Sequence, residues 1–228
     1  MCGRYSFSKS AAKKAEIQKL KGADNVPMSM NIAPTQMAAV ITSDAPDSMK
    51  LMSWGLVPHW QKNLNEAKPL INARVEDIGE KPSFRKAIRQ QRCIVPADSF
   101  YEWRMEGKKR IPYRILNAND ELLWMAGIWD VWTDGIIQKN TFSILTTEPN
   151  LEMKSIHNRM PIFLNTENDR NDWIYPHNVD NQVDNYVNKW INMPDGLLKM
   201  YRVTDKLNKN NYDGDDIHDE VPEPLSLF

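Results

Sequence analysis

The residues with the most unusual chemical potential open the chain, which begins Met1-Cys2-Gly3-Arg4. A side chain as small as that of Cys2 allows methionine aminopeptidase to remove Met1, so the mature chain would begin with a 1,2-aminothiol. Its α-amine, with a reference pKa near ~7.7–8.0, and its thiol, near ~8.5, are both partly deprotonated at neutral pH. The amine can condense with an aldehyde to an imine that the thiol closes to a thiazolidine, or the thiol can attack an acyl group. Position 2 therefore predicts a covalent nucleophile.

A carboxyl group between aromatic rings is the second candidate, in Phe100-Tyr101-Glu102-Trp103. When it is buried, a carboxylic acid in such surroundings can serve as a general acid. The same alternation is typical of a strand that turns its glutamate to solvent, and the strand pattern alone favours that solvent-facing position. Whether Glu102 can act as an acid therefore depends on which face of its strand is covered.

His157 and Arg159 lie close together in the segment 155–161, just before a proline. The imidazole could shuttle a proton while the guanidinium holds an anion. A capping or core position is the commoner fate of a single histidine. The segment is therefore a candidate for proton transfer beside an anion site, and the structural alternative stays open.

Alternating polar residues in the segment 70–76 form a further candidate. In an extended chain, side chains two residues apart point the same way, so Asn72, Arg74 and Glu76 would share one face. That face either binds phosphate or is simply wetted by solvent. Both interpretations remain open on the sequence pattern.

Short strands must position these side chains. Runs rich in β-branched and aromatic residues, separated by frequent turn residues, are typical of an antiparallel sheet or an open barrel. Turns are expected at 31–35, 44–47, 106–108 and 117–120. Strands are expected at Met37–Thr42, 49–54, 93–97, 100–104, 111–116, 122–129 and 141–147.

Helices are expected to cover this sheet. A serine at position 8 or 10 can cap a helix that ends before Gly22. The chain from position 208 is rich in Asn, Asp, Pro and Glu, which predicts an extended tail with its last residues loosely held. Further helical stretches are expected at 83–91, 172–175 and 183–191, with a loop that presents rings at 54–60.

Composition excludes several classes of protein. The chain has 228 residues, of which 41% are hydrophobic and 26% charged, which suits one domain, 1–228, with a real core. Because the formal net charge is −1, any nucleic-acid site must be a local basic patch. With only Cys2 and Cys93 and no signal segment, we expect no disulfide framework and a cytoplasmic location.

No motif points to a metal or a nucleotide cofactor. The four histidines at positions 59, 157, 177 and 218 are scattered, and the two cysteines are far apart in the chain. Neither a GxGxxG nor a GxxxxGK[ST] pattern is present. The longest apolar run, 122–128, is too short to span a membrane. We therefore expect a protein that uses no cofactor, no metal and no membrane segment.

Six segments are specific in combination. They are Met1-Cys-Gly-Arg-Tyr5, Asn31-Ile-Ala-Pro34, Trp54-Gly-Leu-Val-Pro-His-Trp60, Ile71-Asn-Ala-Arg-Val-Glu76, Arg92-Cys-Ile-Val-Pro-Ala-Asp98 with Phe100-Tyr-Glu-Trp103, and Ile156-His-Asn-Arg-Met-Pro161. In this order the chain resembles the SOS response-associated peptidase family, also called abasic-site processing proteins. The resemblance spans nearly the whole chain.

This resemblance implies a single α+β domain with a mostly antiparallel, barrel-like β-sheet flanked by helices. It also implies a protein that binds single-stranded DNA and joins its N-terminal cysteine to the ring-opened aldehyde of an abasic site, in a covalent thiazolidine crosslink. The family's catalytic residues match Cys2, Asn72, Glu102 and His157. Its DNA contacts match Arg4, Arg74 and Arg159 at phosphates, Trp60 and Trp103 near flanking bases, and, in a looser alignment, Arg85 at another phosphate.

Further expectations follow from the same resemblance. Removal of Met1 is expected either by an aminopeptidase or by autoproteolysis, for which Glu102 could serve. An abasic-site lyase activity, a monomeric state and a nucleoid location when the protein is bound to DNA are also expected. One residue departs from the family pattern, because many relatives have Asp where this chain has Asn158, which changes how His157 is oriented.

Two other functions stay open on the sequence. One is an N-terminal-nucleophile cysteine amidohydrolase or peptidase, which would use the thiol on an amide and need no DNA. The other is a non-enzymatic single-strand-binding module in which Cys2 is incidental. A gel shift that survives denaturant and requires an abasic site in single-stranded DNA separates all three.

Overall fold

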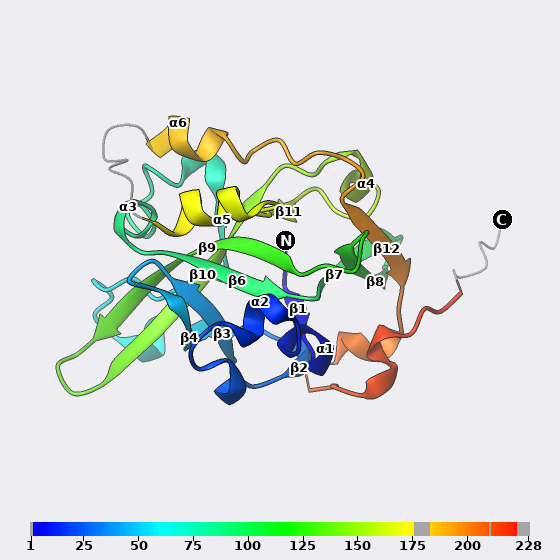
Figure 1. Cartoon of the computed structure of the whole chain (residues 1–228), viewed down its shortest axis with the longest axis horizontal. Coiled ribbons are helices and arrows are strands. Elements are labelled where there is room, and N and C mark those ends of the chain that lie inside the picture. The colour runs from blue at the N-terminus through cyan, green and yellow to red at the C-terminus, as the bar shows by residue number, and fades with distance from the viewer. Residues whose placement is uncertain (1, 176–182, 210, 223–228) are drawn as a thin grey trace.

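Five strands close into a ring at the centre of the molecule, in the order β10–β4–β3–β6–β9 and back to β10 (Figure 1). The computed structural model describes residues 2–175, 183–209 and 211–222. In the ring, β10 and β4 run parallel and the other neighbours run antiparallel. The ring strands are β3 (Met37–Thr42), β4 (Ala45–Trp54), β6 (Arg92–Ala97), β9 (Leu123–Thr133) and β10 (Gln138–Thr147).

A second sheet is antiparallel throughout and has the order β12–β8–β7–β1–β2. Two short strands, β5 and β11, pair with β10 as well. The bounds are β1 (Arg4–Phe7), β2 (Ser29–Ile32), β5 (Asn72–Arg74), β7 (Ser99–Glu106), β8 (Lys109–Asn117), β11 (Met160–Pro161) and β12 (Leu198–Arg202).

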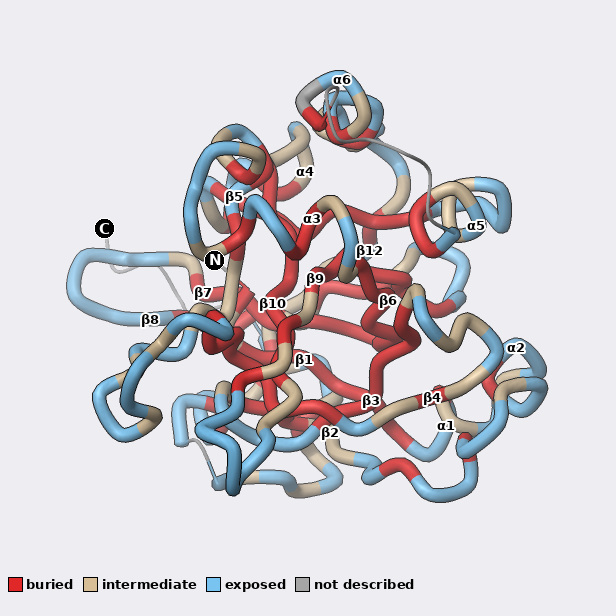
Figure 2. The backbone as a smooth tube through the Cα atoms, turned by 90° about the vertical axis from the view of Figure 1, so that its left-hand side faces the viewer, coloured by how far each residue is buried: buried red, intermediate tan, exposed pale blue. Residues whose placement is uncertain are grey.

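The hydrophobic core lies where the two sheets meet. Aromatic side chains join them, since Tyr5 of β1 meets Trp54 of β4 with ring centroids 5.1 Å apart, and Phe100 of β7 lies 5.8 Å from Phe163. Figure 2 shows the strands as the buried centre and the helices and loops as the exposed rim. Burial of large rings on both sheets contributes strongly to stability and fixes how one sheet sits on the other.

The helices are short and lie around the sheets (Figure 1). In the part of the chain that the structure describes, none is long and apolar enough to cross a membrane. They are α1 (Lys9–Ala12), α2 (Ala15–Gln18), α3 (Ala87–Gln90), α4 (Leu151–Lys154), α5 (Glu167–Ile174) and α6 (Val183–Asn188).

Arg92, at the start of β6, ties two of these helices to the ring. Its side chain is buried and donates to the carbonyl of Trp173 at 2.7 Å, of Tyr175 at 3.1 Å and of Ile88 at 3.2 Å. The guanidinium also lies 5.1 Å from the ring centroid of Tyr186, in α6. Because the last carbonyls of a helix lack partners within the helix, one buried cation here caps both α3 and α5.

We expect Arg92→Met to lower the free energy of unfolding by at least about 3 kcal/mol, since several buried carbonyls would lose charge-assisted hydrogen bonds at once. Urea unfolding measures the change. Lys86→Met, at an exposed position on the same segment, is the matched control and should stay within about 0.5 kcal/mol of the parent. Equal effects of the two substitutions would contradict the capping role of Arg92.

The predicted strands are confirmed, and the fold is α+β with a mostly antiparallel, barrel-like sheet flanked by helices. The five-stranded barrel is closed, whereas the strand pattern predicted an antiparallel sheet or an open barrel. The turn expected at 44–47 is shorter, because residues 43–44 make it and β4 already begins at Ala45. Likewise Asn31 and Ile32 belong to β2, and the turn follows them at 34–35, where Thr35 has a φ of 73°.

The predicted helices exist but are shorter or shifted. The expected first helix is two helices, the first capped by Ser8 as anticipated, and the stretch 83–91 is helical only over α3. The tail is not simply extended, because a 3-10 turn at Asp215–His218 buries Ile217 against the second sheet. The last residues, 223–228, lie outside the described residues, so their predicted looseness and the domain bounds 1–228 stay predictions.

Candidate functional site

Cys2 lies at the entrance to β1 and is fully buried. The side chain of Asn72 reaches it from β5 and donates through Nδ2 to the carbonyl of Cys2 at 2.8 Å. Burial raises the pKa of the Cys2 thiol, and the negative charge of Glu102 adds to this effect. A thiol in this environment stays protonated before Met1 is removed, and Met1 itself lies outside the described residues.

Asn72 owes its place to the parallel pairing of β5 with β10, in which Asn72 lies opposite Ile144. Its Oδ1 is buried and accepts no hydrogen bond from any described residue. An amide oxygen without a donor in a buried place suits a substrate hydroxyl or amine. The geometry brings Asn72 to the residue that the sequence predicted as nucleophile.

Glu102 is 2% exposed, in the middle of β7. It lies opposite Tyr113 of β8, whereas the neighbouring pair that joins Tyr101 to Arg114 faces the other side of the sheet. The strand pattern favoured a solvent-facing Glu102, and that interpretation is wrong because the ring covers this face of the sheet. Glu102 is close enough to Cys2 for its charge to act on the thiol, so the predicted acid and nucleophile share one buried site.

His157 adds an imidazole to the same site. Its Nδ1 lies 4.0 Å from Oε1 of Glu102, and its side chain is 27% exposed. The backbone N–H of Arg159 donates to the same Nδ1 at 3.0 Å, so in the neutral ring the proton sits on Nε2. The backbone of its own loop therefore fixes the orientation of the ring beside Glu102.

Arg159 is held by Glu76. The guanidinium donates to both carboxylate oxygens at 2.6 and 2.9 Å and to the carbonyl of Thr146 at 2.6 Å, and it is 8% exposed. Burial of Glu76 opposes its ionisation, but the hydrogen bonds from Arg159 outweigh this and hold the pKa of Glu76 below its usual range. A phosphate that reached Arg159 would have to replace Glu76, so the predicted phosphate role stays a prediction.

Arg74 ends β5 and is exposed. The extended chain stops there, because Val75–Asp77 is a 3-10 turn, so Glu76 leaves the face that sequence alternation predicted for Asn72, Arg74 and Glu76. Instead, Glu76 turns to Arg159. The three residues therefore differ in their surroundings: Asn72 is hydrogen-bonded to Cys2, Arg74 is an exposed cation, and Glu76 is an ion-paired carboxylate.

Arg4 and Trp103 meet on the far side of the second sheet from Glu102. The guanidinium carbon of Arg4 lies 6.0 Å from the ring centroid of Trp103, and that of Arg110 lies 4.9 Å from it. Trp103 is only 7% exposed, and its ring N–H donates to Oδ1 of Asn208 at 2.8 Å. Burial and the charge of Arg110 lower the pKa of Arg4.

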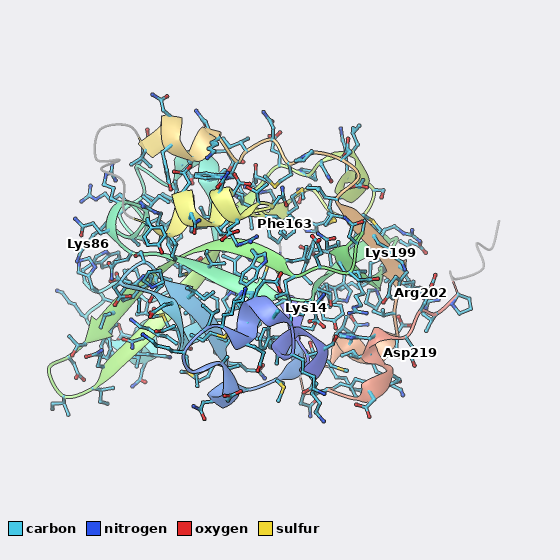
Figure 3. All side chains as sticks on the ribbon, viewed as in Figure 1. Lys14, Lys86, Phe163, Lys199, Arg202 and Asp219 are labelled. Carbon is cyan, nitrogen blue, oxygen red and sulfur yellow. The ribbon has the colours of Figure 1, made fainter. Side chains whose placement is uncertain are left out.

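Trp60 and Arg85 are together but lie apart from Cys2. Both line a surface pocket with His59, Pro82 and Lys86, and Trp60 is 52% exposed. Lys86 lies at one end of the molecule in Figure 3, while β1, which begins two residues after Cys2, lies near the middle of the same view in Figure 1. These two predicted DNA contacts therefore belong to a surface site that is separate from the one around Cys2.

Sequence reasoning missed Arg110, Glu76 as the partner of Arg159, and Asn208 as the residue that orients Trp103. No local pattern could have found them, because each acts on a residue far along the chain or across a hairpin. Within residues 2–175, 183–209 and 211–222, no three His, Cys, Asp or Glu side chains gather as metal ligands.

Comparison with known proteins matches this chain to one family. The family model described as SOS response associated peptidase (SRAP) matches residues 1–210. Abasic site processing protein YoqW of Bacillus subtilis is 39% identical over 186 residues, covering 79% of this chain and 83% of that protein. Abasic site processing protein HMCES of Rattus norvegicus is 30% identical over an alignment that covers 76% of this chain and 64% of that protein. A crystal structure of a Bacteroides thetaiotaomicron protein superposes with a TM-score of 0.83 at 29% identity, covering 97% of this chain and 100% of that one.

Proposed function

The chain belongs to the SOS response associated peptidase family, and on that premise we propose that it processes abasic sites in single-stranded DNA by crosslinking them to Cys2. The observation that carries the proposal is the buried grouping of Cys2 with Asn72 and Glu102, drawn from three separate strands or strand ends. A nucleophile, an orienting amide and an acid are the groups that imine formation requires.

The first step exposes the aminothiol. Water adds across the Met1–Cys2 peptide bond, Met1 leaves with the new carboxylate, and the freed nitrogen becomes the α-amine of Cys2. An aminopeptidase can do this, or the protein can do so itself with Glu102 as proton carrier. Asn72 holds the Cys2 carbonyl and thereby keeps the new amine pointing at the site.

The second step joins protein and DNA. The α-amine attacks the aldehyde carbon of the opened sugar to give a carbinolamine, whose hydroxyl leaves as water with a proton from Glu102. The Cys2 sulfur then adds to the carbon of the protonated imine, and the thiol proton passes to Glu102, which closes the thiazolidine and restores the acid. Because the site is buried, the acid and the nitrogen are shielded from bulk water while these transfers occur.

Two alternative functions differ from this proposal in whether they require DNA and a reactive residue. A cysteine amidohydrolase would use the same thiol on a small amide, and a single-strand-binding module would need no reactive residue. The exposed Arg74 and Trp60 favour a nucleic-acid partner, since cations bind phosphates and rings stack on bases without sequence preference.

The deciding experiment is a denaturing gel of the purified protein with three single-stranded oligonucleotides. One carries an abasic site, one carries the same site reduced to an alcohol, and one is intact. We expect a denaturant-resistant band only with the first, because the reduced sugar has no aldehyde. A band with all three, or with none, would rule out the crosslinking proposal.

Replacing the exposed Arg74 by Ala should weaken non-covalent binding and flatten its salt dependence. The log–log slope of affinity against salt is expected to change by roughly 0.7, the value of one contact on a single strand. Fluorescence anisotropy with an intact oligonucleotide at several salt concentrations measures the slope. An unchanged slope would remove Arg74 from the phosphate-binding residues.

A further inference from the structure

The tip of the β7–β8 hairpin is an exposed basic loop of the second sheet. The residues Arg104 to Arg110 carry four cationic side chains and one carboxylate, in a chain whose formal net charge is −1. Residues 105–110 are all exposed, and Met105 is 59% exposed. Figure 2 shows this hairpin as an exposed loop that projects from the body of the molecule.

The two arginines of this hairpin differ in their partners. Arg104 is ion-paired with Glu106, with Nη2 to Oε1 at 2.5 Å, and it lies over the ring of Tyr113. Arg110 makes no ion pair with any described residue, and its guanidinium lies 4.9 Å from the ring centroid of Trp103. A cation without a carboxylate partner, placed beside a ring, is free to take an outside anion.

Arg110 also lies near the segment that carries the proposed nucleophile, Cys2. It shares the ring of Trp103 with Arg4, which is two residues from Cys2. Trp103 cannot easily move, because Asn208 holds its ring N–H and the apolar residues Val203 and Leu207 pack beside it. Two cations therefore lie near one fixed ring, and of these Arg110 makes no ion pair with any described residue.

We propose that the tip of this hairpin is a further DNA-backbone site in which Arg110, seated on Trp103, binds a phosphate of the strand that carries the abasic nucleotide. This rests on the proposed function above. Along the strand, Arg110 is three residues from Tyr113, the partner of Glu102, or about 10 Å, and its side chain lies on the Trp103 side of the sheet. The contact therefore falls on the part of the DNA strand that flanks the crosslinked sugar.

The chemistry fits a phosphodiester backbone better than an acidic protein. Arg110 offers a planar fork of donors that matches two phosphate oxygens, and Lys108 and Lys109 add point charges next to it. Trp103 is too buried to stack on a base from both sides, so we assign it the task of positioning Arg4 and Arg110. The site would then read charge and not sequence.

The test compares Arg110→Ala with Arg104→Ala, its matched control on the same hairpin. For Arg110→Ala we expect a log–log salt slope shallower by roughly 0.7 on a long single-stranded oligonucleotide, and an affinity weaker by roughly two- to fivefold. Arg104→Ala should leave the slope unchanged, because Arg104 already has Glu106 as its counter-ion. Arg110→Lys should restore the slope. If Arg110→Ala leaves the slope unchanged, or if both arginines contribute equally, the proposal is overturned.

A second test of the Arg110 site varies the length of the oligonucleotide. The abasic nucleotide is placed with one nucleotide on each side, or with ten nucleotides added on the 5′ side or on the 3′ side. Arg110→Ala should match the parent on the short oligonucleotide and differ on one of the extended ones. A loss that persists on the short oligonucleotide would overturn the placement of Arg110 away from the reacting sugar.

The crosslink itself keeps the two proposals apart. The parent protein is first tested for a denaturant-resistant adduct with the abasic oligonucleotide. If the parent forms no adduct, the proposed function fails, while the salt slopes still decide whether Arg110 binds the backbone. If the parent forms the adduct but Arg110→Ala leaves every salt slope unchanged, the hairpin site is rejected and the proposed function stands.

Discussion

Replacing Cys2 by Ala should abolish the denaturant-resistant adduct and leave an imine that borohydride can trap. Alanine at position 2 still permits removal of Met1, so the α-amine remains and can condense with the aldehyde. Without sulfur, the imine cannot close to a thiazolidine and reverses in water. The expected result is a complete loss of the band on a denaturing gel, with a band recovered when borohydride is present during the reaction.

Intact-mass measurement is the control for this experiment, because both the parent and Cys2→Ala must have lost Met1. Active parent protein that fully retains Met1 would contradict the aminothiol mechanism. If Cys2→Ala gives neither a trapped species nor strand cleavage, the amine is not a nucleophile, and the thiol-only hydrolase becomes the better explanation.

The trapped imine also makes a lyase activity testable. An imine that cannot close can lose the proton on the neighbouring carbon, which breaks the strand by β-elimination. His157 is the candidate base, since its imidazole lies in the same site, with Nδ1 4.0 Å from Oε1 of Glu102. Adding His157→Ala to Cys2→Ala should therefore reduce strand cleavage while the borohydride-trapped band remains.

Glu102→Gln should slow adduct formation by roughly 10²- to 10⁴-fold, the usual contribution of a positioned proton donor. The amide keeps the size and the buried position of the carboxyl group but cannot deliver a proton when water leaves the carbinolamine. Single-turnover crosslinking with excess protein measures the rate directly, and the final yield at long times should approach that of the parent.

Glu106→Gln is the matched control for Glu102→Gln, because it removes an exposed carboxylate from the same strand. It should leave the rate of crosslinking within a factor of about two, as is usual for a surface position. Thermal unfolding of both variants excludes misfolding as the cause. A Glu102→Gln variant that crosslinks at the parent's rate would assign the acid step to another group.

The strand pattern of the sequence predicted much of the fold. Alternating apolar residues and turn residues located β3 within its exact bounds and the core of the other long strands, because side-chain period and turn chemistry are local properties. The short strands β1, β2, β11 and β12 were missed, since each is too short to show a period and exists through pairing with a distant partner. The two-helix start and the buried Ile217 likewise depend on packing.

The candidate site was likewise predicted in part from the sequence and decided in part by the fold. The sequence by itself predicted the reactive group, because a cysteine at position 2 becomes an aminothiol once Met1 is removed, and it named Asn72, Glu102 and His157 as candidates. Only the tertiary structure decided that Glu102 is buried beside Cys2, because a strand pattern cannot say which face a second sheet covers.

Tertiary structure also decided how the cations are used. The sequence named Arg159 as an anion-binding residue and gave no role to Arg104 or Arg110. In the fold, Arg159 is held by Glu76 and Arg104 by Glu106, while Arg110 rests on Trp103 without an acidic partner among the described residues. Charge pairing depends on distances of a few ångströms between segments far apart in the chain, and those distances are set by the pairing of strands and the closure of the barrel.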